Sequence, residues 1–297
     1  MGKNGEFDPV SPSGLKSLLK KHDLYAKKSF GQNFLVDGNI LDIIIESARL
    51  EKDDNVIEIG PGLGALTIRI LEEIPDGQLL AIEKDRELCS VLKQELSEFD
   101  NFKLVEADIL EYDLKELLKD KDFKDLDYKL MANLPYNITS PLIRLFLERE
   151  TRPEKMVLMV QREVAERIVA EPGGKDYGTL SIAVQYYARA EIQHYISPEV
   201  FVPRPRVESA IITLDLTAPH SDRADDEDIF FKVVRAMFQQ RRKIIRNSLS
   251  KAAQVDFPRE IVDEALDRAD IDPKIRGEKL SISRVIKLSN ELTKLLK

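Results

Sequence analysis

The sequence predicts an α/β fold, with a mostly parallel sheet of seven strands followed by a small all-helical domain at the C-terminal end. Over the first two thirds of the 297 residues, short buried apolar runs alternate with amphipathic helical patterns, which is typical of parallel strands connected by helices. The last two apolar runs are joined without a helix, which indicates an antiparallel edge. After Thr217 only helical patterns follow, so we expect domains over residues 1–217 and 218–297.

The predicted strands are short, mostly apolar runs bounded by polar or turn-forming residues. Such runs are typical of strands that are buried on both faces of a sheet. Their limits are residues 55–59, 78–82, 102–105, 128–132, 155–160, 192–196 and 210–216.

Helices are expected where apolar residues recur three or four positions apart. Asp37 is a candidate N-cap for the helix over residues 40–48, and Ser140 is a candidate N-cap with Pro141 at the first helical position. Placed between the strands, these helices would cover both faces of the sheet. The other helical patterns lie at residues 15–24, 66–71, 86–96, 163–170, 180–188, 230–251, 259–268 and 281–296.

The composition is that of a globular protein from a reducing compartment. Hydrophobic residues make up 43% of the chain and charged residues 33%. Cys89 is the single cysteine, which excludes an internal disulfide, and the three histidines lack the spacing of metal ligands, so we expect no metal site. No apolar run has the length of a membrane span or of a signal-peptide core. We therefore expect a cytoplasmic protein without a membrane partner.

The charge is unevenly distributed along the chain. The net charge of −8 argues against general binding to polyanions. However, residues 230–255 contain no acidic residue and include Arg241, Arg242 and Lys243. A short charge run is usually a solvated helix face, but a stretch this long without an acid favours contact with an RNA backbone.

Four of the predicted strands are followed or ended by a residue that can hold a ligand. These residues are Gly60, Glu83, Asp108 and Asn133. In open α/β sheets, ligands bind outside the carboxyl ends of the strands. One such residue is ordinary loop chemistry, whereas four at successive strand ends predict a binding site.

The stretch that begins at Asn133 has the groups needed to hold a nucleobase. The Asn133 carboxamide and the Leu134 carbonyl can accept both hydrogens of a primary amine, and Pro135 restricts Leu134 to extended geometry. Tyr136 adds an aromatic ring on which a base can stack. The alternative is a proline-containing turn with a partly buried tyrosine, and these four residues alone do not decide between the two.

The glycines at residues 60–64 also fit a nicotinamide-dependent oxidoreductase. Gly60, Gly62 and Ala65 match the dinucleotide pattern, and Glu83 follows at the expected distance to bind a ribose. Against this alternative, the strand carries Glu58 before the glycines, and no set of residues for hydride transfer is evident.

The motifs, in their order, resemble those of the ribosomal RNA adenine dimethyltransferases. The resemblance extends from about residue 20 to the C-terminus. It rests on residues 31–35, 58–64, 83, 108, 133–138, 201–209 and 240–243.

This resemblance implies a Rossmann-like, S-adenosylmethionine-dependent methyltransferase fold and the transfer of methyl groups to two adjacent adenines near the 3′ end of small-subunit ribosomal RNA. It implies a monomer acting on RNA within a pre-ribosomal particle. The target base would be held by Asn133, Leu134 and Tyr136, with Phe201 closing on its other face and Arg241, Arg242 and Lys243 contacting RNA. The implied contacts with S-adenosylmethionine are Asn33, Leu35, Gly60, Glu83, Asp108 and Asn133.

Two further alternatives stay open. Macrolide-resistance methyltransferases, which act on large-subunit RNA, share the superfamily, although Leu134 and residues 201–209 favour the small-subunit enzymes. A ribosome assembly factor that binds without catalysis is the other alternative, and the intact Asn133 and Tyr136 weigh against it.

Overall fold

The computed structural model describes residues 7–25, 32–112, 127–134, 138–149, 151–251 and 257–297. By its internal contacts the chain divides into two compact units. The first comprises residues 1–165 and 191–217, and the second comprises residues 166–190 and 218–297. The division agrees with the expected boundary after Thr217 but assigns residues 166–190 to the C-terminal unit; the domain boundary itself stays a prediction.

The first unit is built on a mostly parallel sheet. Among the described residues, seven strands pair in the order β4-β3-β2-β5-β6-β9-β7. The pairs that join β4, β3, β2, β5 and β6 are parallel, and β9 is antiparallel to β6. The predicted sheet and its antiparallel edge are therefore confirmed. The strands are β2 (Asn55–Ile59), β3 (Gln78–Glu83), β4 (Phe102–Glu106), β5 (Lys129–Asn133), β6 (Lys155–Gln161), β7 (Arg189–Ile196) and β9 (Ser209–Asp215).

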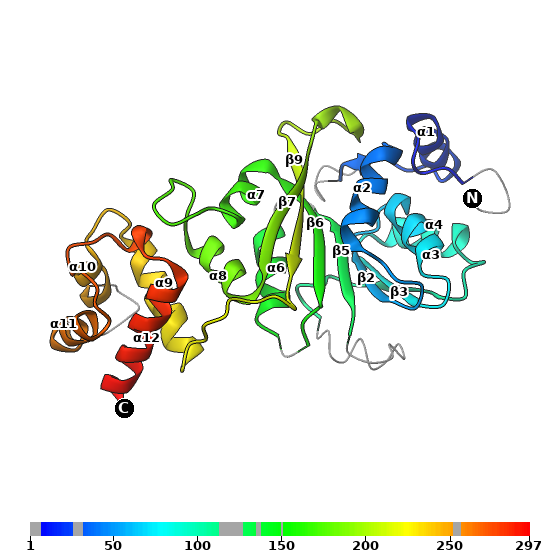
Figure 1. Ribbon diagram of the computed structural model, residues 1–297. Helices are drawn as coiled ribbons and strands as arrows, with labels where there is room; N and C mark the ends of the chain where they lie inside the picture. Colours follow the sequence, from blue (N-terminus) through cyan, green and yellow to red (C-terminus); the bar gives the residue numbers. More distant parts are fainter. Residues whose placement is uncertain (1–6, 26–31, 113–126, 135–137, 150, 252–256) are drawn as a thin grey trace. The chain divides into compact units, whose positions relative to one another are not determined.

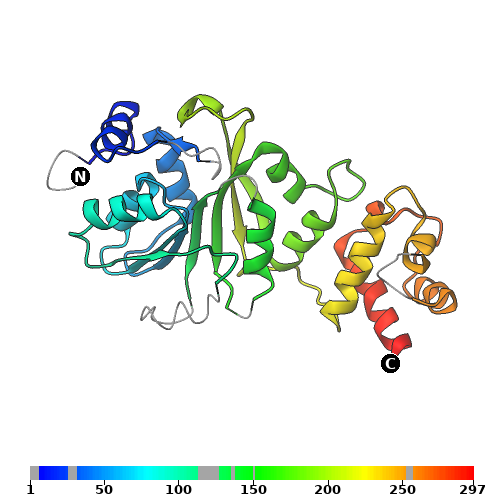
Figure 2. The ribbon, with the colours of Figure 1, turned by 180° about the vertical axis from the view of Figure 1, so that it is seen from behind.

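Helices cover both faces of this sheet (Figure 1). On one face lie α2 (Gly38–Ala48), α3 (Ala65–Glu73) and α4 (Arg86–Glu95), and on the other lies α6 (Thr139–Leu147), as the reverse view also shows (Figure 2). Apolar side chains from α2, α3 and α4 form one core with Val56 of β2, Met131 of β5, and Val157 and Met159 of β6. Because both faces are covered, the central strands are apolar on both sides, which explains why they were predictable as continuous runs.

A second, two-stranded sheet was not predicted. It pairs β1 (Phe34–Leu35) with β8 (Phe201–Val202) in antiparallel fashion, with Leu35 opposite Phe201. A short 3₁₀ helix, Pro198–Val200, precedes β8. This ladder joins segments more than 160 residues apart, and two-residue strands have too little pattern to be found from sequence.

The two predicted N-caps have different outcomes. Asp37 caps α2, since its Oδ1 accepts hydrogen bonds from the backbone N–H groups of Asn39 and Ile40 at 2.9 and 3.2 Å. Ser140 is not an N-cap. Helix α6 begins at Thr139, two residues before the predicted first position Pro141, after an N-cap residue, Ile138, that makes no side-chain capping bond. Pro141 is tolerated there because the first turn of a helix has no intrahelical use for its N–H.

The second unit is helical. Its helices include α8 (Thr179–Tyr187), α9 (Glu227–Gln239), α10 (Ile245–Ser250), α11 (Arg259–Arg268) and α12 (Ile282–Leu296), and α7 (Arg162–Ile168) straddles the division. One predicted helix, residues 230–251, is wrong in extent. It is interrupted at residues 240–244, where Gln240 leaves helical geometry and Ile244 becomes the extended N-cap of α10.

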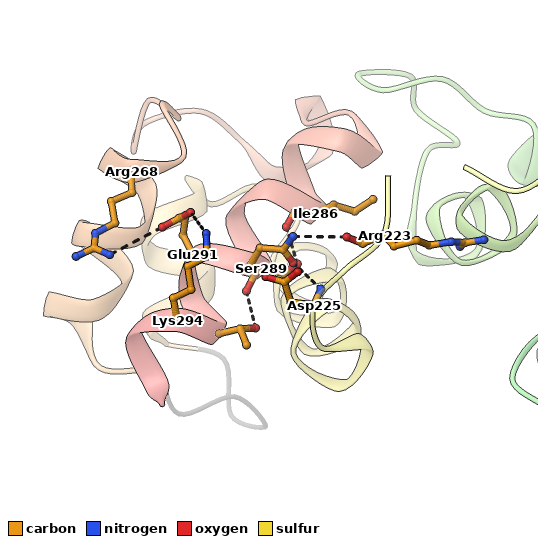
Figure 3. Close-up of polar contacts among 9 residues, drawn as sticks. Arg223, Asp225, Arg268, Ile286, Ser289, Glu291 and Lys294 are labelled. Carbon is orange, nitrogen blue, oxygen red and sulfur yellow. Dashed lines mark hydrogen bonds and ion pairs between the residues drawn. The ribbon is translucent and has the colours of Figure 1, made fainter. Parts of the chain in front are cut away.

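The acidic segment before α9 is anchored to α12 (Figure 3). The Asp225 N–H donates to Oδ1 of Asn290 at 2.9 Å, and the Asn290 amide donates to the Arg223 carbonyl at 3.5 Å. The next residue of α12, Glu291, accepts from Lys294 at 2.8 Å and lies 3.9 Å from Arg268 of α11. The segment before α9 therefore has fixed contacts within its own unit.

Candidate functional site

A cavity of about 270 Å³ lies in the first unit at the carboxyl ends of β2, β3, β4 and β5. It is the position expected for a ligand in an open α/β sheet. The structure brings together at this cavity every described residue predicted to bind the donor or the base. These are Asn33, Leu35, Gly60, Glu83, Asp108, Asn133, Leu134 and Phe201.

A glycine turn forms the floor of the cavity between β2 and α3. Gly60, Gly62 and Gly64 all have positive φ, at 68°, 63° and 85°. A Cβ on Gly64 would stand 3.1 Å from Cδ2 of Leu92, which is tighter than ordinary van der Waals contact. Glycine is needed here because the backbone must turn sharply and leave its N–H groups near the cavity.

Glu83 is held at the end of β3 by backbone donors. Its Oε1 accepts from the Asp85 N–H at 2.8 Å and its Oε2 from the Gly62 N–H at 3.2 Å. Burial raises its pKa, although these backbone hydrogen bonds oppose the shift. The two bonds fix the carboxylate at the cavity wall, where it can accept from hydroxyl groups of a ligand.

Glu58, which was noted only as part of the glycine motif, is a buried carboxyl group in the cavity wall. It is 1% exposed, and its Oε2 has no hydrogen-bond partner among the described residues. Burial raises its pKa to about 8, and the nearby Glu83 adds to the shift. An unpartnered buried oxygen in a cavity wall is a group that a ligand can satisfy.

Asp108 lies in a turn and already has partners. Its Oδ1 accepts from the Leu110 N–H at 3.0 Å, and its Oδ2 pairs with Nζ of Lys84 at 2.5 Å. The hydrogen bond from Lys84 holds the pKa of Asp108 below its usual range. Its side chain is therefore ionised at neutral pH, and it lines the cavity together with Lys84.

The predicted base socket is described in part. Asn133 is the last residue of β5 and is half-buried, Leu134 is 2% exposed, and both line the cavity. Tyr136, predicted to stack on the base, lies outside the described residues. Phe201 lines the cavity from β8 but is 3% exposed and packs in the core against residues such as Leu35.

The N-terminal helix is a wall of the cavity that sequence reasoning missed. Helix α1 (Pro12–Lys21) places Leu15 at the cavity, and Pro9 precedes it there. At its far end, Lys21 Nζ and His22 Nε2 each lie 2.8 Å from Oε1 of Glu95 on α4. The alternation of apolar residues and lysines predicted the helix, but no local pattern shows where it packs.

The three basic residues predicted to bind RNA lie in the second unit, in the interruption between α9 and α10. Arg241 has partners within the unit: Nε donates to Glu278 at 2.6 Å and Nη2 donates to the Gly174 carbonyl at 3.0 Å. Arg242 and Lys243 are exposed. The geometry separates one arginine that holds the unit together from two cations that face solvent.

The groups around the cavity fit a cationic nucleoside such as S-adenosylmethionine. Two buried carboxyl groups, Glu58 and Glu83, suit positive charge and hydroxyl groups, and the buried Oε2 of Glu58 has no partner among the described residues. The apolar part of the lining includes Leu63, Leu88 and Ile109, which suit a flat heterocycle. Within the described residues, no cluster of three histidine, cysteine or acidic side chains is arranged to bind a metal ion. The described helices include none with the length and hydropathy to cross a membrane.

Comparison with known proteins shows what this arrangement resembles. A family model described as ribosomal RNA adenine dimethylase matches residues 24–294. Ribosomal RNA small subunit methyltransferase A of Halothermothrix orenii is 46% identical over 286 residues, covering 95% of this chain and 93% of the relative. The protein of the same name from Clostridioides difficile is 45% identical over 280 residues, covering 94% and 95%.

Two solved structures share the fold and the sequence to a lesser degree. A dimethyladenosine transferase from Plasmodium falciparum superimposes with a TM-score of 0.74 at 26% identity, covering 88% of this chain and 97% of the other. The 23S rRNA methyltransferase ErmE gives a TM-score of 0.66 at 26% identity, covering 88% and 100%.

Proposed function

The chain belongs to the ribosomal RNA adenine dimethylase family, and we propose that it transfers methyl groups from S-adenosylmethionine to the exocyclic amines of two adjacent adenines near the 3′ end of small-subunit ribosomal RNA. The observation that carries the proposal is that Gly60, Glu83, Asp108 and Asn133 all line one cavity. Family membership decides against the nicotinamide-dependent oxidoreductase.

The donor side of the cavity binds and orients S-adenosylmethionine. Glu83, fixed by two backbone N–H groups, accepts from the ribose hydroxyls, and the glycine turn lets the backbone approach the ligand. Asp108, together with Asn33, Leu35 and Asn133, completes the donor contacts. The donor supplies an activated methyl group on a positively charged sulfur.

The acceptor side holds the amine of the target adenine. Its nitrogen is a poor nucleophile because its lone pair is delocalised into the ring. The Asn133 side-chain oxygen and the Leu134 carbonyl accept its two hydrogens, which favours a pyramidal nitrogen with a localised lone pair. That shape belongs to the transition state, so these contacts increase the rate of transfer and do not only strengthen substrate binding. Alignment of nitrogen, methyl and sulfur supplies a further part of the rate, while Tyr136 and Phe201 hold the base.

The partner is small-subunit RNA within a pre-ribosomal particle in the cytoplasm, with the protein acting as a monomer. The acidic chain is repelled by RNA in general, so recognition depends on local basic surfaces such as Arg242 and Lys243. This arrangement favours a folded particle over naked RNA, because only the particle presents phosphates in a fixed shape.

The test is methyl transfer in vitro. Small subunits from cells that lack the protein are incubated with it and labelled S-adenosylmethionine, and the digested RNA is analysed by mass spectrometry. Two N6,N6-dimethylated adenosines per subunit are expected, with Glu83→Ala weakening donor binding in calorimetry.

Other results would point elsewhere. Methylation of large-subunit RNA would favour the macrolide-resistance type, to which the likeness with ErmE lends weight. Binding of small subunits without any methyl transfer would make the protein an assembly factor only.

A further inference from the structure

Glu58 is the buried charged group to which the proposed chemistry gives no part. Glu58 is 1% exposed, is one of the residues that line the donor cavity, and has a buried Oε2 atom without a partner among the described residues. Buried polar atoms are almost always hydrogen-bonded, so an unpartnered one calls for a physical reason.

The surroundings of Glu58 disfavour its negative charge. In the sheet it lies between Ala81 of β3 and Met131 of β5, neither of which can stabilise an anion. Burial, with a contribution from Glu83, raises its pKa to about 8. The Thr67 hydroxyl of α3 lies near enough to oppose this shift but makes no hydrogen bond of good geometry within the described part of the chain.

The described cations of the cavity lining and of α2 and α3 are already paired with other acids. Lys84, the cation of the cavity lining, pairs with Asp108 at 2.5 Å. Arg69 of α3 lies 3.2 Å from Asp42 of α2 and 3.6 Å from Glu72 of its own helix, and all three side chains are partly exposed. Within the described part of the chain neither of these cations is left for Glu58, so a cationic ligand would be the group that neutralises it.

We propose that Glu58 carries a proton while the cavity holds no donor and releases it to solvent when S-adenosylmethionine binds, so that donor binding and proton release are one linked equilibrium. The inference rests on the proposed function only in taking S-adenosylmethionine as the ligand. That molecule carries a sulfonium and an ammonium group, and a nearby positive charge favours the ionised form of a carboxyl group. Glu58 thus becomes a positioning residue for the donor's charged portion.

The linkage has a defined sign. Below about pH 8 the empty protein holds the proton that the complex lacks, so donor affinity rises with pH, by at most about tenfold per pH unit for one proton. Above that pH the proton is already lost and affinity levels off. At pH 6.5, binding should release close to one proton per donor.

Calorimetry of donor binding without RNA tests this. Titrations at pH 6.5 in two buffers of different ionisation enthalpy give the number of protons released; this pH is below the usual pKa of about 7.7–8.0 of an α-amino group, so the donor's own ammonium contributes little. The native protein should release about one proton and Glu58→Gln none. Adenosine has neither positive charge, so its binding should release no proton from either the native protein or Glu58→Gln. Melting curves establish that Glu58→Gln is folded, which is expected because glutamine has the shape of the protonated acid.

A second measurement needs no variant. The infrared difference spectrum of the native protein should lose a protonated-carboxyl band when S-adenosylmethionine is added. Donor binding without proton release, equal release by Glu58→Gln, or equal release with adenosine overturns the inference and leaves the proposed function standing. A native protein that does not bind S-adenosylmethionine overturns the proposed function, and the inference with it.

Discussion

At the scale of single residues, neighbouring carboxyl groups of one cavity are given different properties by their contacts. Glu83 accepts two backbone hydrogen bonds, Asp108 pairs with Lys84, and Glu58 has neither kind of compensation for its Oε2 among the described residues. The pKa of Asp108 is therefore lowered, whereas burial raises that of Glu58 to about 8. The chemistry of each acid follows from its partners rather than from its type.

Asn133 is expected to matter for transfer more than for binding. Asn133→Ala removes one acceptor for the amine and should slow methyl transfer by about 2.7–4 kcal/mol in activation free energy, by analogy with the loss of one preorganised polar contact in other enzymes. The measurement is single-turnover methylation of small subunits, with binding of the subunits followed in parallel. Asn55→Ala, at the opposite end of the adjacent strand β2, is the matched control and should leave turnover unchanged. Normal turnover by Asn133→Ala would refute the base socket.

Glu58 should also make stability depend on pH. Its pKa is about 8 in the folded protein against an ordinary value of 4.5, so the folded state holds a proton that the unfolded chain releases. Stability of the donor-free protein should fall as pH rises from about 4.5 to 8, by at most about 1.4 kcal/mol per pH unit. Urea unfolding between pH 5 and pH 8 measures it, and Glu58→Gln should flatten the dependence. Glu98→Gln, at an exposed position, is the control; parallel curves for the native protein and Glu58→Gln would contradict the expectation.

At the scale of elements, the glycine turn between β2 and α3 determines the shape of the donor site. Gly64 is the N-cap residue of α3 and closes the turn at a φ of 85°. Helix α1 and strand β1 come from the N-terminal segment and contribute Leu15 and Leu35 to the cavity lining. The site thus needs both a glycine turn at positive φ and a packed terminal segment.

Gly64→Ala should destabilise the protein more than Gly173→Ala. Both glycines have nearly the same positive φ, 85° and 87°, so both variants carry a similar backbone strain of about 1–2 kcal/mol. A Cβ at Gly64 would also press on Leu92 at 3.1 Å, whereas at Gly173 no described atom lies within 4 Å. Denaturant unfolding should show a larger loss of stability for Gly64→Ala than for Gly173→Ala. Donor calorimetry should show a weaker affinity for Gly64→Ala only. Equal effects of the two substitutions on donor affinity would argue against this role of the turn.

At the scale of the whole molecule, an acidic protein must bind a polyanion through local surfaces. The net charge is −8, and the acid-free stretch at residues 230–255 includes both paired and exposed cations. Arg241 pairs with Glu278, and Arg246 pairs with Asp263, whereas Arg242 and Lys243 are exposed. The prediction that all three residues of the Arg241–Lys243 run bind RNA is therefore narrowed to a proposal for the last two.

The double variant Arg242→Ala/Lys243→Ala should reduce the salt dependence of binding to small subunits. Each lost phosphate contact lowers the slope of log affinity against log salt by about 0.9. Binding across a salt series measures the slope, and native protein on naked RNA should bind more weakly than on subunits. Lys175→Ala, which removes an exposed cation from the same unit, should keep the native slope. An unchanged slope in the double variant, or an equal loss in Lys175→Ala, would assign RNA docking to another surface.

The sequence by itself determined the sheet and the residues at its edge. Buried parallel strands need continuous apolar runs, so all seven could be found with limits close to those observed, apart from the earlier start of β7 at Arg189. Strand ends in parallel sheets lie at one edge, so Gly60, Glu83, Asp108 and Asn133 could be placed at one site. The N-cap predicted from local chemistry at Ser140 is wrong. Serine is a good capping residue, but the helix already begins at Thr139, so Ser140 lies inside it.

Only the tertiary structure decided the contacts between distant segments. The pairing of Leu35 with Phe201, the packing of α1 at the cavity, and the bond from Arg241 to Glu278 join residues far apart in sequence. The burial of Glu58 depends on α3, β3 and β5 together. A local pattern records which residues are apolar or charged, but whether a charge is paired, exposed or desolvated depends on neighbours that only folding brings together.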